Sequence, residues 1–259
     1  MIRLVWSVQE RKAKKIFKNS HCGLDQICVC DVTKLDEGFP KGLDGAEAMI
    51  ICTSANQKIS KLSIVYQILC IPLNIVTRKK SFNFRGLRFW YASGQSPEKV
   101  DYEGQIAQIQ LAIELGISHI VLVSSMGGTD PNNFLNSIGK NKDGTGDGDI
   151  LIWKRKAEQY LIASGLEYTI IHPGLLNDGI GGISEIMLDI DDELMKNEER
   201  SISRSDLAML CIASLTIGKG KNVSFDCTAS EYKEETDIKH ATLLLDGFIL
   251  SGKTCTYQI

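Results

Sequence analysis

The stretch VDYEGQIAQIQLAIELGISHIVLVSS, residues 100–125, combines two patterns that together decide the fold. In its first part, apolar side chains recur every three or four residues, as at Ile106 and Ile109, which predicts a helix over residues 100–115. Gly116 follows where glycine commonly ends a helix. The second part, HIVLVSS, is a β-branched run without polar alternation, as in a strand buried on both faces. A helix leading directly into such a strand indicates a parallel sheet covered by helices.

The same alternation of strands and helices continues along the chain. Similar apolar runs predict strands at residues 3–6, 27–32, 48–53, 119–125, 168–173 and 223–227, and helical spacing recurs over residues 152–163 and 204–215. This order predicts an α/β fold with a doubly wound, mostly parallel sheet. We expect one domain over residues 1–228, with a variable lid or insertion at 57–97, followed by a C-terminal helix and tail at 229–259.

Composition excludes several classes of function. The 259 residues are 43% hydrophobic and 24% charged, and the net charge of −3 argues against a general nucleic-acid partner. The eight cysteines include no C-x-x-C pair, and the four histidines do not cluster near them, so we expect no metal site. The cysteine pattern also fits a reducing compartment rather than a disulfide framework.

One long apolar run, LSIVYQILCIPLNIVT at residues 62–77, is followed by Arg78, Lys79 and Lys80. The run is short for a membrane span and is interrupted by polar residues and Pro72. We therefore expect a buried or lid-like helix here, and no membrane partner.

The glycine-rich and acidic loop KDGTGDGD, residues 142–149, resembles two ligand-binding loops without matching either. Its three aspartates would repel a phosphate, and no lysine followed by serine or threonine closes it as a P-loop requires. Counted as a calcium loop from Asp143, it has Lys154 where the twelfth position needs a bidentate glutamate. The preferred interpretation is a solvated connector made of turn-forming residues.

In a sheet of this kind, ligands bind at the carboxyl ends of the strands. The residues there are small or carry hydroxyl groups, which suits the close backbone approach of an extended ligand such as a dinucleotide. They are Trp6-Ser7, Asp31-Val32-Thr33, Thr53-Ser54-Ala55, Ser124-Ser125-Met126-Gly127-Gly128 and His172-Pro173-Gly174-Leu175.

These features, in this order, resemble the short-chain dehydrogenase/reductase superfamily, and more closely its atypical NAD(P)-binding, NmrA-like branch of plants and cyanobacteria. The most specific matches are SSMGGT and the later segment WKRKAEQYLIASGLEYTIIHPG. The likeness runs from about residue 2 to about residue 228, interrupted at 57–97. It implies a Rossmann-like sheet and a dinucleotide cofactor, NADP in preference to NAD, with a small-molecule substrate.

The resemblance also implies a role for particular residues. Asp31 and Val32 would meet the adenine edge, while Thr53, Ser54 and Ala55 would lie along the adenosine ribose and pyrophosphate. Ser125 and Lys154 would be the catalytic pair that faces the nicotinamide and its ribose. Pro173, Gly174 and Leu175 would lie behind the carboxamide. The glycine-rich loop would then serve to deliver the helix that carries Lys154.

Each of these candidates has a structural alternative. Lys154 stands beside Arg155 and Lys156 and could be one of three surface cations, and Asp31 could simply begin a turn. Ser125 could cap the segment that follows it. For His172 we expect a hydrogen-bonded structural role, because no acid lies beside it in the sequence.

The chain departs from the family pattern at its catalytic positions. Ile150 stands four residues before Lys154, where the superfamily has a tyrosine that donates a proton, and Met126 replaces the catalytic serine or threonine. The atypical branch commonly lacks this tyrosine. An oxidoreductase acting on an unidentified small molecule is expected. A non-catalytic module that senses NADP or binds a protein partner is the alternative, and the sequence leaves both open.

The beginning of the chain departs from the family pattern as well. The usual first strand and its glycine-rich turn are missing, so we expect the sheet to lack that strand. Trp6 occupies the place of an arginine that pairs with the 2′-phosphate of NADP, and Arg11 or Lys12 could substitute for it. We expect a cytoplasmic protein, or a plastid protein if a transit peptide was lost with the missing segment.

Overall fold

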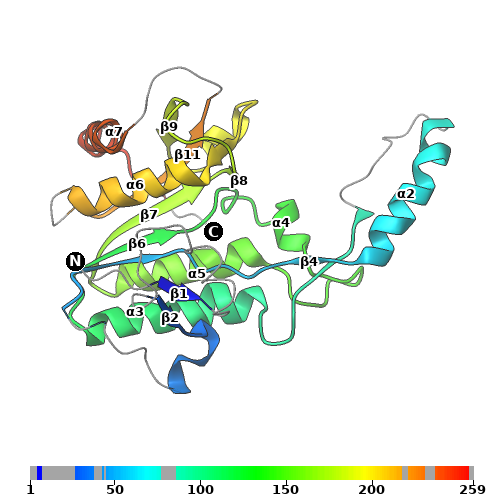
Figure 1. Cartoon of the computed structure of the whole chain (residues 1–259), viewed down its shortest axis with the longest axis horizontal. Coiled ribbons are helices and arrows are strands. Elements are labelled where there is room, and N and C mark those ends of the chain that lie inside the picture. Colours follow the sequence, from blue (N-terminus) through cyan, green and yellow to red (C-terminus); the bar gives the residue numbers. More distant parts are fainter. Residues whose placement is uncertain are drawn as a thin grey trace.

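The computed structural model describes residues 5–7, 27–37, 43, 45–76, 86–217, 221–230 and 237–256. Its centre is a five-stranded sheet in the order β3-β6-β7-β11-β9 (Figure 1). The first four strands are parallel, and β9 runs antiparallel to β11 at one edge. The strands span Ala48–Ile51 (β3), His119–Val123 (β6), Glu167–Pro173 (β7), Val223–Ala229 (β11) and Ile186–Asp189 (β9).

Two layers of helices enclose this sheet (Figure 1). They are α3 (Gly104–Glu114) and α5 (Ile150–Ala163) on one face, and α6 (Arg204–Thr216) and α7 (Ile238–Leu250) on the other. Alternate residues of one strand reach opposite layers: Ile170 of β7 packs with α3 and α5, whereas Ile171 packs with α6 and α7. The sheet is therefore buried on both faces, which confirms the doubly wound α/β fold that the apolar runs predicted.

Helix ends follow the predicted glycine signals. Gly116 and Gly165, just beyond α3 and α5, have φ values of 70° and 79°, in the left-handed region that glycine adopts readily. The start of the first predicted helix differs, because residues 98–103 form a π-helical turn, η4 (Glu98–Glu103), before α3 begins.

The first two strands do not join this sheet. β1 (Val5–Ser7) and β2 (Ile27–Val29) pair in parallel with each other as a separate two-stranded sheet. Among the described strands, only β6 pairs with β3, and Ile50 on β3 is exposed. The resemblance places a further strand of the family between β3 and β1.

Smaller elements lie around the sheet. β9 and the short strands β4, β5, β8 and β10 were not predicted, because runs of two to four residues carry little periodic signal. The short strands form two pairs, β4 (Lys58–Ile59) with β5 (Phe89–Trp90) and β8 (Leu175–Asn177) with β10 (Ser201–Ser203). The other small elements are the helix α4 (Phe134–Ser137) and the 3₁₀ turns η2 (Val32–Glu37) and η5 (Glu193–Lys196).

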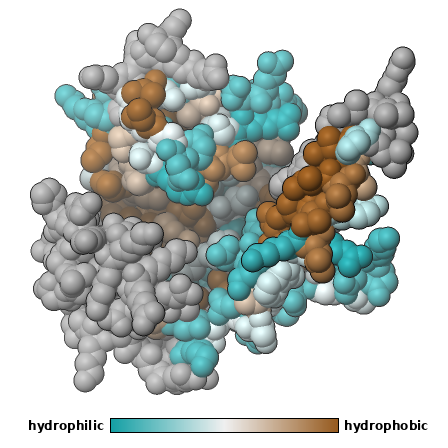
Figure 2. All heavy atoms as spheres, turned by 45° about the vertical axis from the view of Figure 1, so that its right-hand side comes forward, coloured by the Kyte–Doolittle hydropathy of each residue, from teal (hydrophilic) through white to brown (hydrophobic). Residues whose placement is uncertain are grey.

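The apolar run at 62–77 forms the helix α2 (Lys61–Val76), which projects from the body of the molecule (Figure 1). Five of its large apolar side chains are exposed and form a broad hydrophobic surface (Figure 2); they are Leu62, Val65, Tyr66, Ile68 and Leu69. Of the expected buried or lid-like helix, the buried form is wrong, because exposed apolar side chains such as Leu62 and Leu69 lie along the outside; the lid-like form stays a prediction. No helix in the described ranges is long and apolar enough to cross a membrane.

Candidate functional site

A buried ion pair joins Lys154, one of the predicted cofactor residues, to Asp101. The Nζ atom of Lys154, in the second turn of α5, lies 2.7 Å from Oδ1 of Asp101 in η4, and both side chains are buried. The other oxygen of Asp101 accepts a hydrogen bond of 2.9 Å from the backbone N–H of Ala55. Asp101 thus ties the helix that carries Lys154 to the loop after β3. Sequence analysis missed Asp101.

The loop after β3 is fixed by two glutamines of α3. The Nε2 atom of Gln105 donates to the carbonyl oxygen of Thr53 at 2.9 Å, and Nε2 of Gln108 donates to the Thr53 hydroxyl at 3.0 Å. Ser54, between Thr53 and Ala55, remains exposed. Both glutamines are buried, so the loop is held in a defined position with Ser54 toward solvent.

The predicted adenine-edge residues differ in their environments. Val32 is buried in a small cluster with Ala55, Tyr91, Val100 and Ile138, which brings it next to the loop after β3. The carboxylate of Asp31 accepts hydrogen bonds from the backbone N–H and the hydroxyl of Thr33, at 3.0 and 2.8 Å. Asp31 therefore stabilises its own turn in this structure. The side chain of Trp6, together with Arg11 and Lys12, lies outside the described residues.

Ser125 lies at the carboxyl end of β6, in the middle of the sheet. The pairing between β6 and β7 continues into this loop, because Ser124 N–H donates to the Ile171 carbonyl at 2.8 Å and Met126 N–H donates to the Pro173 carbonyl at 3.1 Å. Ser125 is half-buried, and its hydroxyl donates to the Met126 carbonyl at 3.1 Å. The loop is therefore rigid and offers a hydroxyl group at the edge where the resemblance places the nicotinamide.

The turn after β7 is equally constrained. Gly174 N–H donates to the carbonyl of Cys227 at 2.9 Å, and Leu175 N–H donates to the carbonyl of Arg200 at 2.8 Å. The Leu175 side chain is exposed, whereas Pro173 is buried. This turn therefore connects the central strand to β11 and β10 and presents Leu175 to solvent.

Gly174→Ala should destabilise the protein by about 1–3 kcal/mol, because an added Cβ would overlap the Arg200 carbonyl oxygen. Gly247→Ala in the exposed part of α7 is the matched control: nothing lies within 4 Å of its added Cβ, and alanine should stabilise that helix by about 0.5–1 kcal/mol. Urea unfolding of both variants measures the difference. Equal stability of the two would show that the Gly174 turn can relax.

Behind Ser125 lies a fully buried group of charged side chains. Glu158 on α5 accepts hydrogen bonds from the Ser124 hydroxyl and from Arg155 Nη1, the latter at 2.7 Å. His172 of β7 lies between two acids, with Nε2 3.1 Å from Glu158 and Nδ1 3.1 Å from Asp226. The structural role expected for His172 agrees with these contacts, although both acids are distant in sequence and were not foreseen.

The pKa values of this group follow from its contacts. Burial by itself would raise the pKa of Glu158, but the nearby His172 and Arg155 outweigh burial and lower it to about 2. Burial would likewise lower the pKa of His172, yet the Glu158 charge and the hydrogen bonds to both acids raise it well above its usual value. His172 Nε2 also lies 2.7 Å from Arg155 Nη1, so the imidazole contacts the cation of this group as well as its two acids.

The same group supports the loop after Ser125. Asp226 accepts a hydrogen bond from the Asp192 backbone N–H at 2.6 Å. The Asp192 carboxylate in turn accepts from Gly127 N–H at 2.6 Å and from the Thr129 hydroxyl at 2.6 Å. A continuous path of polar contacts thus runs from His172 to the SSMGGT loop, and it fixes the loop from behind.

No described tyrosine takes the place of the missing catalytic one. Ile150 begins α5, as the sequence indicated. Tyr91 is buried near the charge of Asp101. Its pKa is raised to about 12, mainly by burial and further by the negative charges of Asp101 and Asp147. A phenol in this environment holds its proton, whereas a catalytic acid needs a lowered pKa.

The glycine-rich loop has the character of a connector. Residues 141–147 are exposed, and Asp143 accepts hydrogen bonds from the backbone N–H and hydroxyl of Thr145. Asp149 directly before α5 adopts a φ of 64° and pairs with Lys140 at 2.6 Å. The loop thus ends in a fixed residue that sets the start of the helix carrying Lys154. Across the described ranges, no group of three or more histidine, cysteine, aspartate or glutamate side chains is suited to a metal ion.

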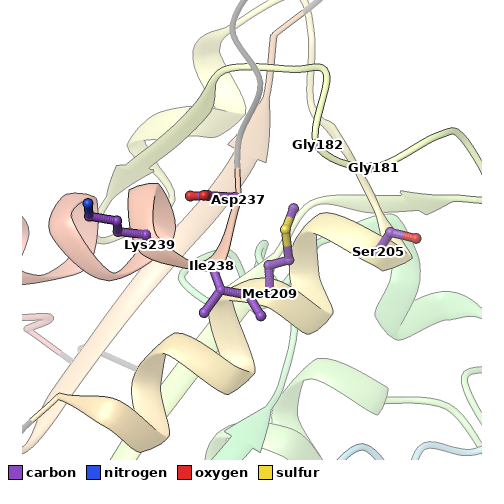
Figure 3. A pocket seen from close by; sticks show the side chains of 7 residues that line it. All are labelled: Gly181, Gly182, Ser205, Met209, Asp237, Ile238 and Lys239. Carbon is purple, nitrogen blue, oxygen red and sulfur yellow. The ribbon is translucent and has the colours of Figure 1, made fainter. Parts of the chain in front are cut away.

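A cavity of about 590 Å³ lies apart from these residues, between the start of α6, the start of α7 and the turn at 181–182 (Figure 3). Its lining is Gly181, Gly182, Ser205, Met209, Asp237, Ile238 and Lys239. None of the predicted site residues lines it. Asp237 is already used as the N-cap of α7, where its side chain accepts from His240 N–H.

The described residues fit one half of a dinucleotide better than the other. Ser125 offers a hydroxyl at the carboxyl end of β6, and Lys154 offers an ammonium on α5; these are the groups that the resemblance assigns to the nicotinamide and its ribose. For the pyrophosphate, the loop after β3 offers fewer donors, because Ala55 N–H is already bonded to Asp101.

Comparisons with known proteins identify the family of the chain. A family described as NAD(P)H-binding matches residues 10–217. Sanguinarine reductase of Eschscholzia californica is 40% identical over 205 residues, which cover 79% of this chain and 72% of that protein. An uncharacterized chloroplastic protein of Arabidopsis thaliana is 38% identical over 207 residues, covering 79% of this chain and 55% of that protein.

A solved structure described as an NAD-dependent epimerase/dehydratase from Bacillus halodurans supports the fold alone. It aligns with a TM-score of 0.54 at 19% identity and covers 94% of this chain and 86% of that one. Taken together, the matched family, the sanguinarine reductase likeness and the sheet with its helices show that this chain belongs to the NAD(P)H-binding, atypical short-chain dehydrogenase/reductase family.

Proposed function

We propose that the protein is an NADP-dependent reductase of a small electrophilic molecule. The observation that carries this proposal is the buried Lys154–Asp101 pair, which fixes an ammonium group of α5 next to the loop after β3. The relative named sanguinarine reductase supports reduction as the direction of the reaction. A bound nicotinamide supplies the hydride; the chain positions it and excludes water.

The proposed roles at the site follow from what each group can do. Lys154 would donate a hydrogen bond to the ribose next to the nicotinamide, with Asp101 fixing the direction of its ammonium group. Ser125 would donate to the substrate or the carboxamide from the rigid loop after β6. Thr53, Ser54 and Ala55 would lie along the adenosine half, and Pro173, Gly174 and Leu175 behind the nicotinamide ring.

The missing proton donor limits the class of substrate. A ketone that accepts hydride becomes an alkoxide and needs a proton, which neither Ile150 nor Tyr91 can supply. An iminium ion that accepts hydride becomes a neutral amine and needs no proton, and a quinone gives a delocalised, weakly basic anion. We therefore propose cationic or quinone-like electrophiles as substrates.

Turnover assays test this proposal directly. NADPH oxidation is followed by absorbance with sanguinarine, with menadione and with cyclohexanone, and the first two should be reduced while the ketone is not. Replacing NADPH by NADH should weaken binding, because no acid at the end of the first predicted strand can hold the ribose of NAD. Reduction of cyclohexanone at a comparable rate would contradict the assigned substrate class.

The alternative is a module that binds NADP without catalysis, and Ile150 with Met126 favours it. Saturable NADPH binding without turnover of any probe would support this alternative over the reductase. For location we propose the plastid, because the similar Arabidopsis protein is chloroplastic. A fluorescent fusion of the full transcript product that stays outside plastids in a plant cell would contradict that location.

A further inference from the structure

The helix α2 buries polar side chains and exposes large apolar ones, the reverse of a usual surface helix. Ser63 and Gln67, four residues apart, face the protein with exposed fractions of 8% and 7%, and the Ser63 hydroxyl accepts a hydrogen bond from Arg88 N–H. On the opposite side, Leu62 and Leu69 are 82% and 73% exposed. In water a helix buries its apolar stripe, so this orientation indicates that the outer side meets an apolar phase.

The outward side is continuous and large. Leu62, Val65, Tyr66 and Leu69 follow helical spacing along it, and Ile68 extends it sideways; all are exposed. Figure 1 shows α2 projecting from the rest of the molecule, and Figure 2 shows the hydrophobic side chains of α2 on the surface. Ile59 and Trp90, on the two short strands beside α2, are exposed as well.

The charge around α2 is one-sided. From residue 48 to residue 97 the sequence has no aspartate or glutamate and seven cations, which are Lys58, Lys61, Arg78, Lys79, Lys80, Arg85 and Arg88. The whole chain has a net charge of −3, so the remaining residues carry −10. A helix with an apolar outer side and cations at both ends matches the pattern of helices that lie in the interface of an anionic membrane.

The charge also argues against a second copy as the partner. Two chains that met through α2 would bring two segments of charge +7 together, and this repulsion opposes a dimer through that surface. The sixteen residues of α2 are about 24 Å long, at about 1.5 Å per residue, which is shorter than a bilayer core but suits a helix lying in the interface.

We propose that α2 attaches the protein to an anionic lipid surface, with Leu62, Val65, Tyr66 and Leu69 inserted among the acyl chains and the flanking cations on the lipid headgroups. The earlier expectation of no membrane partner weighed only a spanning helix; the outward orientation of α2 is what changes it. This inference is independent of the proposed reductase activity, because it involves no residue of the cofactor site.

Flotation of the full chain with vesicles tests the attachment. Vesicles of phosphatidylcholine containing phosphatidylglycerol should carry the protein, and vesicles of phosphatidylcholine alone should carry much less. Leu62→Glu with Leu69→Glu should abolish flotation, while Leu250→Glu, on an equally exposed leucine of α7, should leave it unchanged. Lys79→Gln with Lys80→Gln should weaken binding roughly fivefold per lysine, and high salt should weaken it further.

Several outcomes would overturn the proposal. It fails if neither kind of vesicle carries the protein, or if the Leu62→Glu, Leu69→Glu variant floats as well as the wild type. It also fails if size-exclusion chromatography shows a dimer that this variant abolishes while vesicles bind neither form, because the surface would then join two copies. NADPH turnover measured on the same samples separates a failed attachment from a failed reductase assignment.

Discussion

Glu158→Gln is expected to lower the free energy of unfolding by about 3–5 kcal/mol. The carboxylate is fully buried and contacts His172, Arg155 and the Ser124 hydroxyl. Glutamine has nearly the same shape but no charge. Arg155 and His172 would therefore stay buried without the negative charge that Glu158 places beside them. Urea unfolding at pH 6 measures the loss.

The control for this variant is Asp178→Asn. Asp178 pairs with Arg204 at 2.7 Å, the same distance as between Glu158 and Arg155, but both side chains are largely exposed. Solvent screens such a pair, so its removal should change stability very little. If the two variants lost similar stability, burial would not be what makes the Glu158 contacts strong.

The same group makes a prediction about pH. The pKa of Glu158 is depressed from 4.5 to about 2 in the folded chain, so its contribution is present above pH 4.5 and is lost as the pH falls through about 2. The pKa of His172 is raised above 6.5, so its contribution is present below pH 6.5 and is lost as the pH rises through the folded value. The difference in stability between wild type and Glu158→Gln should therefore be largest between about pH 4.5 and 6.5.

Removing both charges of the Lys154–Asp101 pair is expected to weaken NADPH binding about 10- to 100-fold. One hydrogen bond from a charged donor contributes about 1.5–3 kcal/mol, which corresponds to that range of affinity. The double variant Lys154→Met, Asp101→Asn leaves no unpaired charge inside the protein, so the fold should be retained. Fluorescence titration of NADPH, with a thermal unfolding control, makes the measurement.

The single variant Lys154→Met separates the two roles of the lysine. It leaves Asp101 buried without its cation and should destabilise the protein by about 3–5 kcal/mol, unlike the double variant. If the double variant folds like the wild type and binds NADPH equally well, Lys154 serves only the fold. The reductase proposal would then lose the contact on which it most depends.

Much of the sheet could be predicted because its signals are local. The apolar runs of β6 and β7 and the spacing of α3 and α5 lie within about fifteen residues of chain, and the glycines at 116 and 165 mark helix ends without reference to anything distant. The short strands β4, β8 and β10 could not be predicted, because two or three residues are too few to show a periodic pattern.

For the candidate site, the sequence could predict the residues at strand ends but not the buried charged contacts around them. The residues after β3, β6 and β7 could be expected at one edge because these strands are parallel in one sheet; their roles stay predictions. Asp101 was not found, since its partners Ala55 and Lys154 are 46 and 53 residues away along the chain. Glu158, His172 and Asp226 were also invisible as a group, because no sequence spacing links α5, β7 and β11.

The sequence by itself determined the doubly wound α/β fold and the order of its main elements, because hydrophobic periodicity and glycine signals act over a few residues. Only the tertiary structure decided which charges meet inside the protein and which way α2 turns its apolar side. Those outcomes depend on contacts between distant segments, and the apolar run of α2 would read the same whether its stripe faced the core or the outside.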